Sequence, residues 1–214
     1  MKLNKQMKLE IINILKMKKL IGMNHIQPIS VSMKKVENKI LPNTINNLEE
    51  YVHNCFLCTL SKSNKIFAKG NPLSSVYIVG LNYNYDEETE FLLLKKMIEN
   101  VIHISIGDTC MTNILKCKSN KIQNNLDNEV QKCIPYLEQQ ISISKPSLII
   151  TLGKAFSYMM NTTEQNTDVY GSLFSYNSID LVPLMDPNFI YKNPSYKEKM
   201  YSDLKKIKKI MDEK

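Results

Sequence analysis

Short, mainly apolar runs alternate along this chain with longer segments whose apolar residues recur at helical spacing. Runs of the first kind predict buried strands at residues 76–80, 109–115, 148–152 and 179–184. Segments of the second kind predict helices at residues 44–54, 87–101, 127–142, 154–160 and 194–214. Strands that alternate with helices are typical of a parallel sheet covered by helices on both faces. We therefore expect a three-layer α/β/α domain with a central, mainly parallel sheet of four strands.

The beginning of the chain has a different pattern. Residues 3–21 place apolar side chains at helical spacing and carry several lysines, and residues 22–43 contain Pro28 and Pro42. We predict a helix and a connector over residues 1–43 and a single domain over residues 44–214. A basic amphipathic helix can also lie on DNA or on a membrane surface, but packing against a domain is the commoner outcome.

Composition narrows the class of protein. The chain has 214 residues, 43% of them hydrophobic, so it can bury one full core. Its net charge is +7 and it contains no arginine, which suits nucleic acid as a partner, although a biased nucleotide composition explains the lysines equally well. We expect no signal peptide, and the sequence has no apolar run near the ~18 residues of a membrane helix. We expect a cytoplasmic monomer, in a bacterial-type cytosol or nucleoid, with no membrane partner.

Four cysteines form the most specific chemical signal. Cys55 and Cys58 are two residues apart, Cys117 ends a Thr-Asn-x-x-Lys-Cys run, and Cys133 opens Cys-x-Pro-Tyr-Leu. Four thiolates suit either tetrahedral zinc or an iron–sulfur cluster, and their spacing does not choose between them. Unlinked buried thiols are the third interpretation, although a Cys-x-x-Cys pair is seldom accidental in a chain with few cysteines. We expect the fifth, Cys110, to be a small buried apolar residue.

The order of these motifs resembles the family 4 uracil-DNA glycosylases. The shared features are Cys-x-x-Cys, a strand that ends in Gly80, Thr-Asn-x-x-Lys-Cys, Cys-x-Pro-Tyr-Leu, and Leu-Gly after an apolar strand, within about residues 50 to 210. The resemblance implies a 4Fe-4S cluster on the four cysteines, with zinc the less favoured alternative. It also implies that uracil-containing DNA, single- or double-stranded, is the partner and that uracil is excised by hydrolysis.

Asn113 matches the family position that reads uracil. Its amide offers one donor and one acceptor, which complement the O4 acceptor and the N3–H donor of uracil, whereas cytosine reverses both. The alternative is an asparagine that simply ends a strand in a turn. Ligands of such sheets bind at the carboxyl ends of the strands, and we expect Asn113, Gly80, Gly153 and Asp186 all to lie there.

Two motifs depart from the family. Gly80-Leu81-Asn82-Tyr83-Asn84 stands where the family has Gly-Glu-Ala-Pro-Gly, and Leu81 cannot replace the carboxylate that positions the attacking water. Asp86 is a candidate substitute, although an acid there can equally stabilise the start of a helix. Tyr83, Tyr85 and Phe91 are candidates for the aromatic ring that stacks on uracil.

The second departure lies in the 186–194 segment, which aligns with the family's His-Pro-Ser-x-Leu-Leu-Arg-x-Pro loop. Asp186 replaces the histidine that donates to uracil as its negative charge develops. An ionised Asp186 repels that charge, but it can in principle activate water on the sugar side. Asn188 takes the serine position, and Lys192 takes the arginine position and keeps a charge directed at phosphate.

The sequence therefore supports a uracil-DNA glycosylase-like repair protein. A catalytically degenerate iron–sulfur relative that only binds DNA is the first alternative. A zinc-stapled interaction module is the second.

Overall fold

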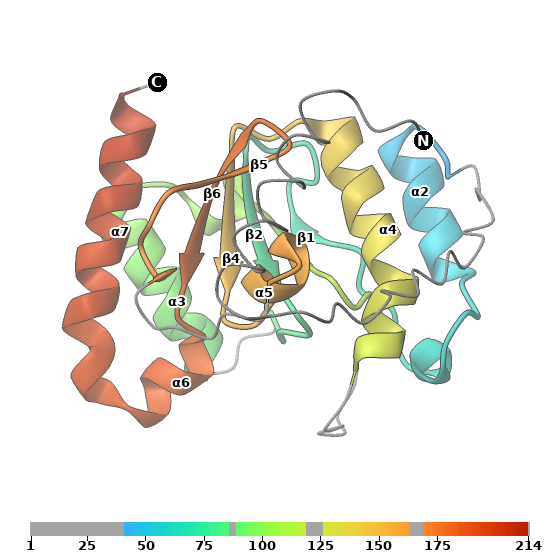
Figure 1. Cartoon of the computed structure of the whole chain (residues 1–214), viewed down its shortest axis with the longest axis horizontal. Coiled ribbons are helices and arrows are strands. Elements are labelled where there is room, and N and C mark those ends of the chain that lie inside the picture. Colours follow the sequence, from blue (N-terminus) through green and yellow to red (C-terminus); the bar gives the residue numbers. More distant parts are fainter. Residues whose placement is uncertain (1–40, 86–88, 119–125, 163–168, 214) are drawn as a thin grey trace, which may run out of the picture. The chain divides into compact units, whose positions relative to one another are not determined.

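The computed structural model describes residues 41–85, 89–118, 126–162 and 169–213, which form one sheet between two layers of helices (Figure 1). The helix predicted at residues 3–21 lies outside the described residues, as does nearly all of the connector. The predicted boundary at residue 43 therefore stays a prediction.

The central sheet has the strand order β1-β3-β2-β4-β6-β5. Its strands are β1 (Lys69–Gly70), β2 (Val76–Gly80), β3 (Cys110–Asn113), β4 (Leu148–Leu152), β5 (Phe174–Tyr176) and β6 (Ile179–Leu184). The four predicted strands are β2, β3, β4 and β6, and they pair in parallel. The prediction of four strands in total was wrong, because β1 and β5 add antiparallel edges. Both edge strands are too short, and too exposed, to give an apolar run.

Two apolar cores cover the two faces of the sheet. Helices α2 (Ile45–His53), α4 (Asp127–Ser144) and α5 (Ala155–Met160) lie over one face, and helices α3 (Thr89–Val101), α6 (Pro187–Lys192) and α7 (Lys197–Asp212) over the other (Figure 1). Side chains of β2 alternate between the cores, with Tyr77 and Val79 in the first and Val76 and Ile78 in the second. This confirms the three-layer α/β/α architecture expected from the sequence. Within the described part of the chain, no helix is long and apolar enough to cross a membrane.

The segment after β6 differs from the expected loop followed by one long helix. Residues Pro187–Lys192 form the short helix α6, a 3₁₀ turn covers Pro194–Tyr196, and α7 begins only at Lys197. Asp186 caps α6, and Pro187 follows in the first turn, where its missing N–H breaks no helical hydrogen bond. The chain therefore forms two short helical turns, α6 and the 3₁₀ turn, between β6 and the last helix.

Candidate functional site

The carboxyl ends of the parallel strands meet at one edge of the sheet, which is the lower edge in Figure 1. Gly80 and Asn113 end β2 and β3 and are register partners. Gly153 directly follows β4, and Asp186 lies two residues beyond the end of β6. The structure thus brings the four predicted strand-end residues to the same edge, where ligands bind in sheets of this type.

Asn113 is buried and its amide is already paired. Its Oδ1 accepts a hydrogen bond from the backbone N–H of Tyr83 at 2.8 Å, and its Nδ2 donates to the backbone carbonyl of the same residue at 2.8 Å. Only 3% of Asn113 is exposed. The predicted base reader, Asn113, therefore already uses one acceptor and one donor in bonds to the backbone of one residue, Tyr83.

The rings of this segment are packed rather than free to stack. Tyr83 and Tyr85 are buried with ring centroids 5.1 Å apart. The Tyr85 hydroxyl accepts from the Gly80 N–H at 3.1 Å and donates to the Thr112 carbonyl at 2.7 Å. Burial raises the pKa of Tyr85 well above its usual value, so this hydroxyl stays protonated. Tyr83 is thus placed beside Asn113, but as part of the core.

Gly80 makes this close packing possible. A Cβ at this position would lie 2.6 Å from Asn113 Oδ1 and 2.7 Å from Tyr83 Cβ, both too close for real contacts. Only glycine therefore lets the 81–85 segment fold back over the end of β2.

A cavity of about 390 Å³ lies beside this segment. Three of its lining residues follow β2, β4 and β6, and the others come mainly from the segments before β5 and after β6. The lining residues are Leu81, Gly153, Lys154, Tyr170, Met185, Asp186, Phe189 and Tyr196. Its walls are mostly apolar and aromatic, with one carboxylate and one ammonium group. Asn113 does not line it, so the structure does not bring all the residues that the sequence assigned to a single site to this cavity.

Asp186 has a structural task in addition to any chemical one. Its Oδ1 accepts from the backbone N–H of Asn188 at 2.8 Å and so caps α6. Gly153, with a φ of +53°, packs closely against Asp186, and a Cβ at position 153 would lie 3.0 Å from Asp186 Cβ. Burial and the Asp186 charge raise the pKa of Tyr170 on another wall of the cavity.

The remaining predicted site residues lie further out. The side chains of Asn188 and Lys192 are exposed on α6, and neither residue lines the cavity. Lys192 is in the last turn of the helix, where a cation complements the helix dipole. Asp86 lies outside the described residues.

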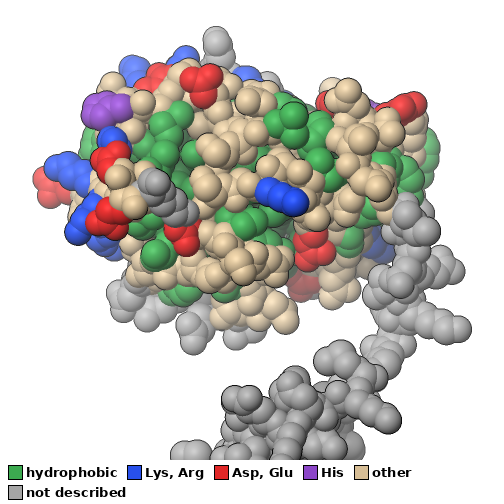
Figure 2. Space-filling view, turned by 90° about the horizontal axis from the view of Figure 1, so that it is seen from above, with side chains coloured by type: hydrophobic (Ala, Val, Ile, Leu, Met, Phe, Trp, Pro, Cys, Tyr) green, Lys and Arg blue, Asp and Glu red, His purple; other side chains and the backbone are tan. Residues whose placement is uncertain are grey.

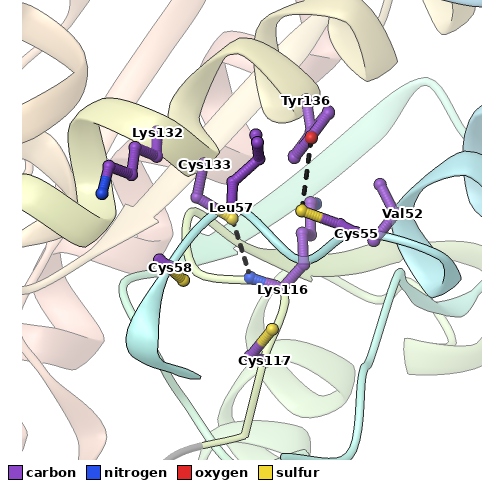
Figure 3. Close-up of a pocket in the computed structure, with 9 residues that line it drawn as sticks. All are labelled: Val52, Cys55, Leu57, Cys58, Lys116, Cys117, Lys132, Cys133 and Tyr136. Carbon is purple, nitrogen blue, oxygen red and sulfur yellow. Dashed lines mark hydrogen bonds between the residues drawn. The ribbon is translucent and has the colours of Figure 1, made fainter. Parts of the chain in front are cut away.

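The four predicted metal ligands line one pocket (Figure 3). Cys55 and Cys58 lie on the segment after α2, Cys117 follows β3, and Cys133 lies on α4. Two contacts order the thiols: the Lys116 backbone N–H donates to Cys133 Sγ at 3.3 Å, and the Tyr136 hydroxyl contacts Cys55 Sγ at 3.3 Å. The fifth cysteine, Cys110, is fully buried in the core, which confirms the prediction for it.

The thiols surround this pocket without converging on a point. Among the described residues, no group of three or more His, Cys, Asp or Glu side chains is arranged to hold a metal ion. A single zinc ion with Zn–S bonds of about 2.3 Å needs its sulfurs only about 3.8 Å apart. A four-iron cluster is a larger body, and its thiolates attach at separate corners. The four cysteines around one pocket supply the number and kind of donors that such a cluster requires.

The pocket is partly desolvated. Burial raises the pKa of Cys133 to about 11 and also raises the pKa of Cys117, so both thiols are protonated near neutral pH. Metal loading at this site would consequently release protons.

Two lysines that the sequence did not single out are part of these sites. Lys116 is buried, and its ammonium donates to Gln140 Oε1 at 2.7 Å and to Thr112 Oγ1, joining α4 to β3 next to the cysteine pocket. Burial lowers its pKa to about 8. Lys154 is the cation that lines the 390 Å³ cavity. In sequence, Lys116 is distinguished by its place in the Thr-Asn-x-x-Lys-Cys motif, whereas Lys154 is distinguished only by its position after a strand.

Comparison with known proteins identifies the family of this fold. The model of the "Uracil DNA glycosylase superfamily" matches residues 67–205. The chain belongs to this superfamily. Type-4 uracil-DNA glycosylases of Sulfurisphaera tokodaii and Saccharolobus solfataricus are each 26% identical to it over 78% of its length and 84% and 86% of theirs. The Type-4 uracil-DNA glycosylase of Pyrobaculum aerophilum is 28% identical over 75% of this chain and 91% of its own length.

Proposed function

We propose that this protein is a DNA glycosylase that recognises uracil in DNA and hydrolyses its N-glycosidic bond. The observation that carries the proposal is the 390 Å³ cavity at the carboxyl ends of β2, β4 and β6, in a chain of this superfamily. Its aromatic and apolar walls suit a flipped nucleotide, and a cavity of this size lies within the usual range for small-ligand sites.

The reaction needs two kinds of help from the chain. The C1′–N1 bond breaks with its electron pair leaving on uracil, and a water oxygen adds to C1′ as it loses a proton. Lys154 is the cation at the cavity and would stabilise the leaving anion, as a fixed donor does for developing charge. Asp186 is the carboxylate at the cavity and would accept the proton of the water.

We assign the pocket of Cys55, Cys58, Cys117 and Cys133 to a 4Fe-4S cluster. The support is that all four thiols line one pocket, as the four ligands of one cluster must. The cluster would join α2, β3 and α4, three segments far apart in sequence, and so supply folding energy. Zinc is the alternative metal, and its tetrahedral coordination would require the four sulfurs to lie about 3.8 Å from one another.

DNA is the partner implied by this activity. The face of the molecule seen in Figure 2 is the edge where the parallel strands begin, opposite the cavity, and its basic and acidic side chains are intermixed. Contact with the phosphate backbone is therefore expected at the cavity end, where Lys154 and the exposed Lys192 lie. We expect the protein to act as a monomer in the cytoplasm or nucleoid.

A catalytically degenerate DNA-binding relative is the second candidate. Two observations favour it: Leu81 brings no polar group to the cavity, and Asp186 uses one oxygen to cap α6. A helix cap alone is sufficient reason for an aspartate to occur at this position.

Uracil release separates the two candidates. The anaerobically prepared protein would be incubated with oligonucleotides that carry one deoxyuridine, single-stranded or paired with guanine, and strand breaks at the resulting abasic sites would be counted. Matched oligonucleotides with thymine in place of uracil serve as the control. Release of uracil above this control supports the glycosylase, whereas tight uracil-selective binding without release supports the degenerate relative.

A further inference from the structure

The backbone of Tyr83 presents to Asn113 the same pattern that uracil presents. Uracil offers an N3–H donor beside an O4 acceptor, and Tyr83 offers its N–H and its own carbonyl. Both hydrogen bonds are 2.8 Å long, and Asn113 and Tyr83 are both buried. These two bonds occupy an acceptor and a donor of the Asn113 amide, which is the pair that the edge of a uracil base would need.

The residue type at position 83 permits this contact. Proline stands here in the Gly-Glu-Ala-Pro-Gly motif that the 80–84 segment resembles, and proline has no N–H to donate. A proline ring would also place its Cδ where the Tyr83 hydrogen now points toward Asn113 Oδ1. The bond therefore depends on the replacement of proline by a residue with an N–H.

Several contacts hold the 81–85 segment in this position. The Tyr85 hydroxyl bonds to both Gly80 and Thr112, its ring packs on those of Tyr83 and Phe91, and the Lys69 ammonium donates to the Tyr85 carbonyl. The Leu115 N–H also donates to the Leu81 carbonyl at 3.0 Å. The closed arrangement is thus supported by packing on both sides of Tyr83 and is not an accident of one rotamer.

We propose that Tyr83 is a specificity-determining residue whose backbone competes with uracil for Asn113. This inference rests on the proposed function, since it concerns recognition of the same base. A base that must displace two buried hydrogen bonds binds as though only the open fraction of the protein were present. Two such bonds favour the closed state on the order of tenfold to a hundredfold, so uracil affinity is lowered by a similar factor.

The decisive variant is Tyr83→Pro. Binding would be measured with a single-stranded oligonucleotide that carries 2′-fluorodeoxyuridine, whose glycosidic bond resists hydrolysis, and with the matched thymine oligonucleotide. We expect Tyr83→Pro to increase uracil affinity relative to thymine by about tenfold or more. Circular dichroism and a thermal melt establish that the variant is folded. A folded Tyr83→Pro variant without a gain in uracil affinity overturns the inference.

A measurement on the unmodified protein covers the case in which the proline variant does not fold. Amide hydrogen exchange of Tyr83 would be followed by NMR in the free protein and with saturating 2′-fluorodeoxyuridine oligonucleotide. We expect slow exchange in the free protein and faster exchange once uracil takes Asn113. Fast exchange in the free protein, or uracil-selective binding with Tyr83 still protected, overturns the inference but leaves the proposed function intact. Failure of both proteins to prefer uracil removes the proposed function and this inference with it, and Tyr83 protection in the free protein then marks a purely structural contact.

Discussion

Substitution of Asp186 can separate its structural role from a chemical one. Its Oδ1 caps α6 through the Asn188 N–H at 2.8 Å, and its carboxylate lines the proposed active cavity. Asparagine caps helices about as well as aspartate but carries no charge and cannot take a proton from water, whereas alanine removes both functions. The pair Asp186→Asn and Asp186→Ala therefore divides the two contributions.

The expected magnitudes differ clearly between the variants. Loss of an N-cap costs about 1 kcal/mol, so Asp186→Ala should lower the free energy of unfolding by that amount. For a domain of this size the melting temperature should then fall by about 2–4 °C. Asp186→Asn should change stability by less than about 0.5 kcal/mol, since the capping oxygen is kept. If the carboxylate is the base for water, Asp186→Asn should nevertheless lower the rate of uracil release by roughly 10²-fold to 10⁴-fold.

Thermal melts of the cluster-loaded protein and single-turnover uracil release would be measured on the same preparations. A melting temperature that falls equally in both variants would refute the capping argument. Full activity in Asp186→Asn would refute the assignment of a catalytic carboxylate, and activity lost only in Asp186→Ala would assign the effect to the helix position rather than to charge.

Three further predictions follow from the same sites. Anaerobically purified protein should be brown, with iron and sulfide each near four per chain, and stoichiometric zinc without sulfide would contradict the cluster. The Cys133→Ser variant should lose iron and sulfide, while Cys110→Ser should keep both. DNA affinity should fall steeply with salt, and an affinity independent of salt would exclude phosphate contacts. The Lys192→Ala variant should weaken binding equally for uracil-containing and ordinary DNA, and should reduce the slope of log affinity against log salt by about one. If the wild type proves nearly inactive, Leu81→Glu combined with Asp186→His should raise uracil release at least about tenfold, measured against each single variant because groups that act together are non-additive.

Much of the fold could be predicted from the sequence because buried parallel strands are nearly continuous apolar runs. The four central strands and the helices between them follow from such runs and from helical spacing. The edge strands β1 and β5 could not be predicted, since two or three partly exposed residues carry no periodic signal. Their place is fixed by backbone pairing with β3 and β6.

The sequence by itself predicted the four candidate cysteines and most of the strand ends, although β3 ends at Asn113 and not at residue 115 as predicted. Cysteine spacing selected four thiols, and strand boundaries put Gly80, Asn113 and Asp186 at one edge of the sheet, because parallel strands share the direction of their ends. The Asp-Pro-Asn run also carried a helix-start signal at Asp186, which the resemblance to a loop concealed.

Only the tertiary structure decided what these groups touch. The Asn113 amide is paired by the backbone of Tyr83, and no side-chain pattern encodes such a contact, because every residue except proline presents the same N–H and carbonyl. Likewise Lys116 and Lys154 have the same chemistry in sequence, yet one is buried beside the cysteine pocket and the other lines the cavity. Their different surroundings arise from packing between segments that are distant in the chain, and this is the information that local sequence lacks.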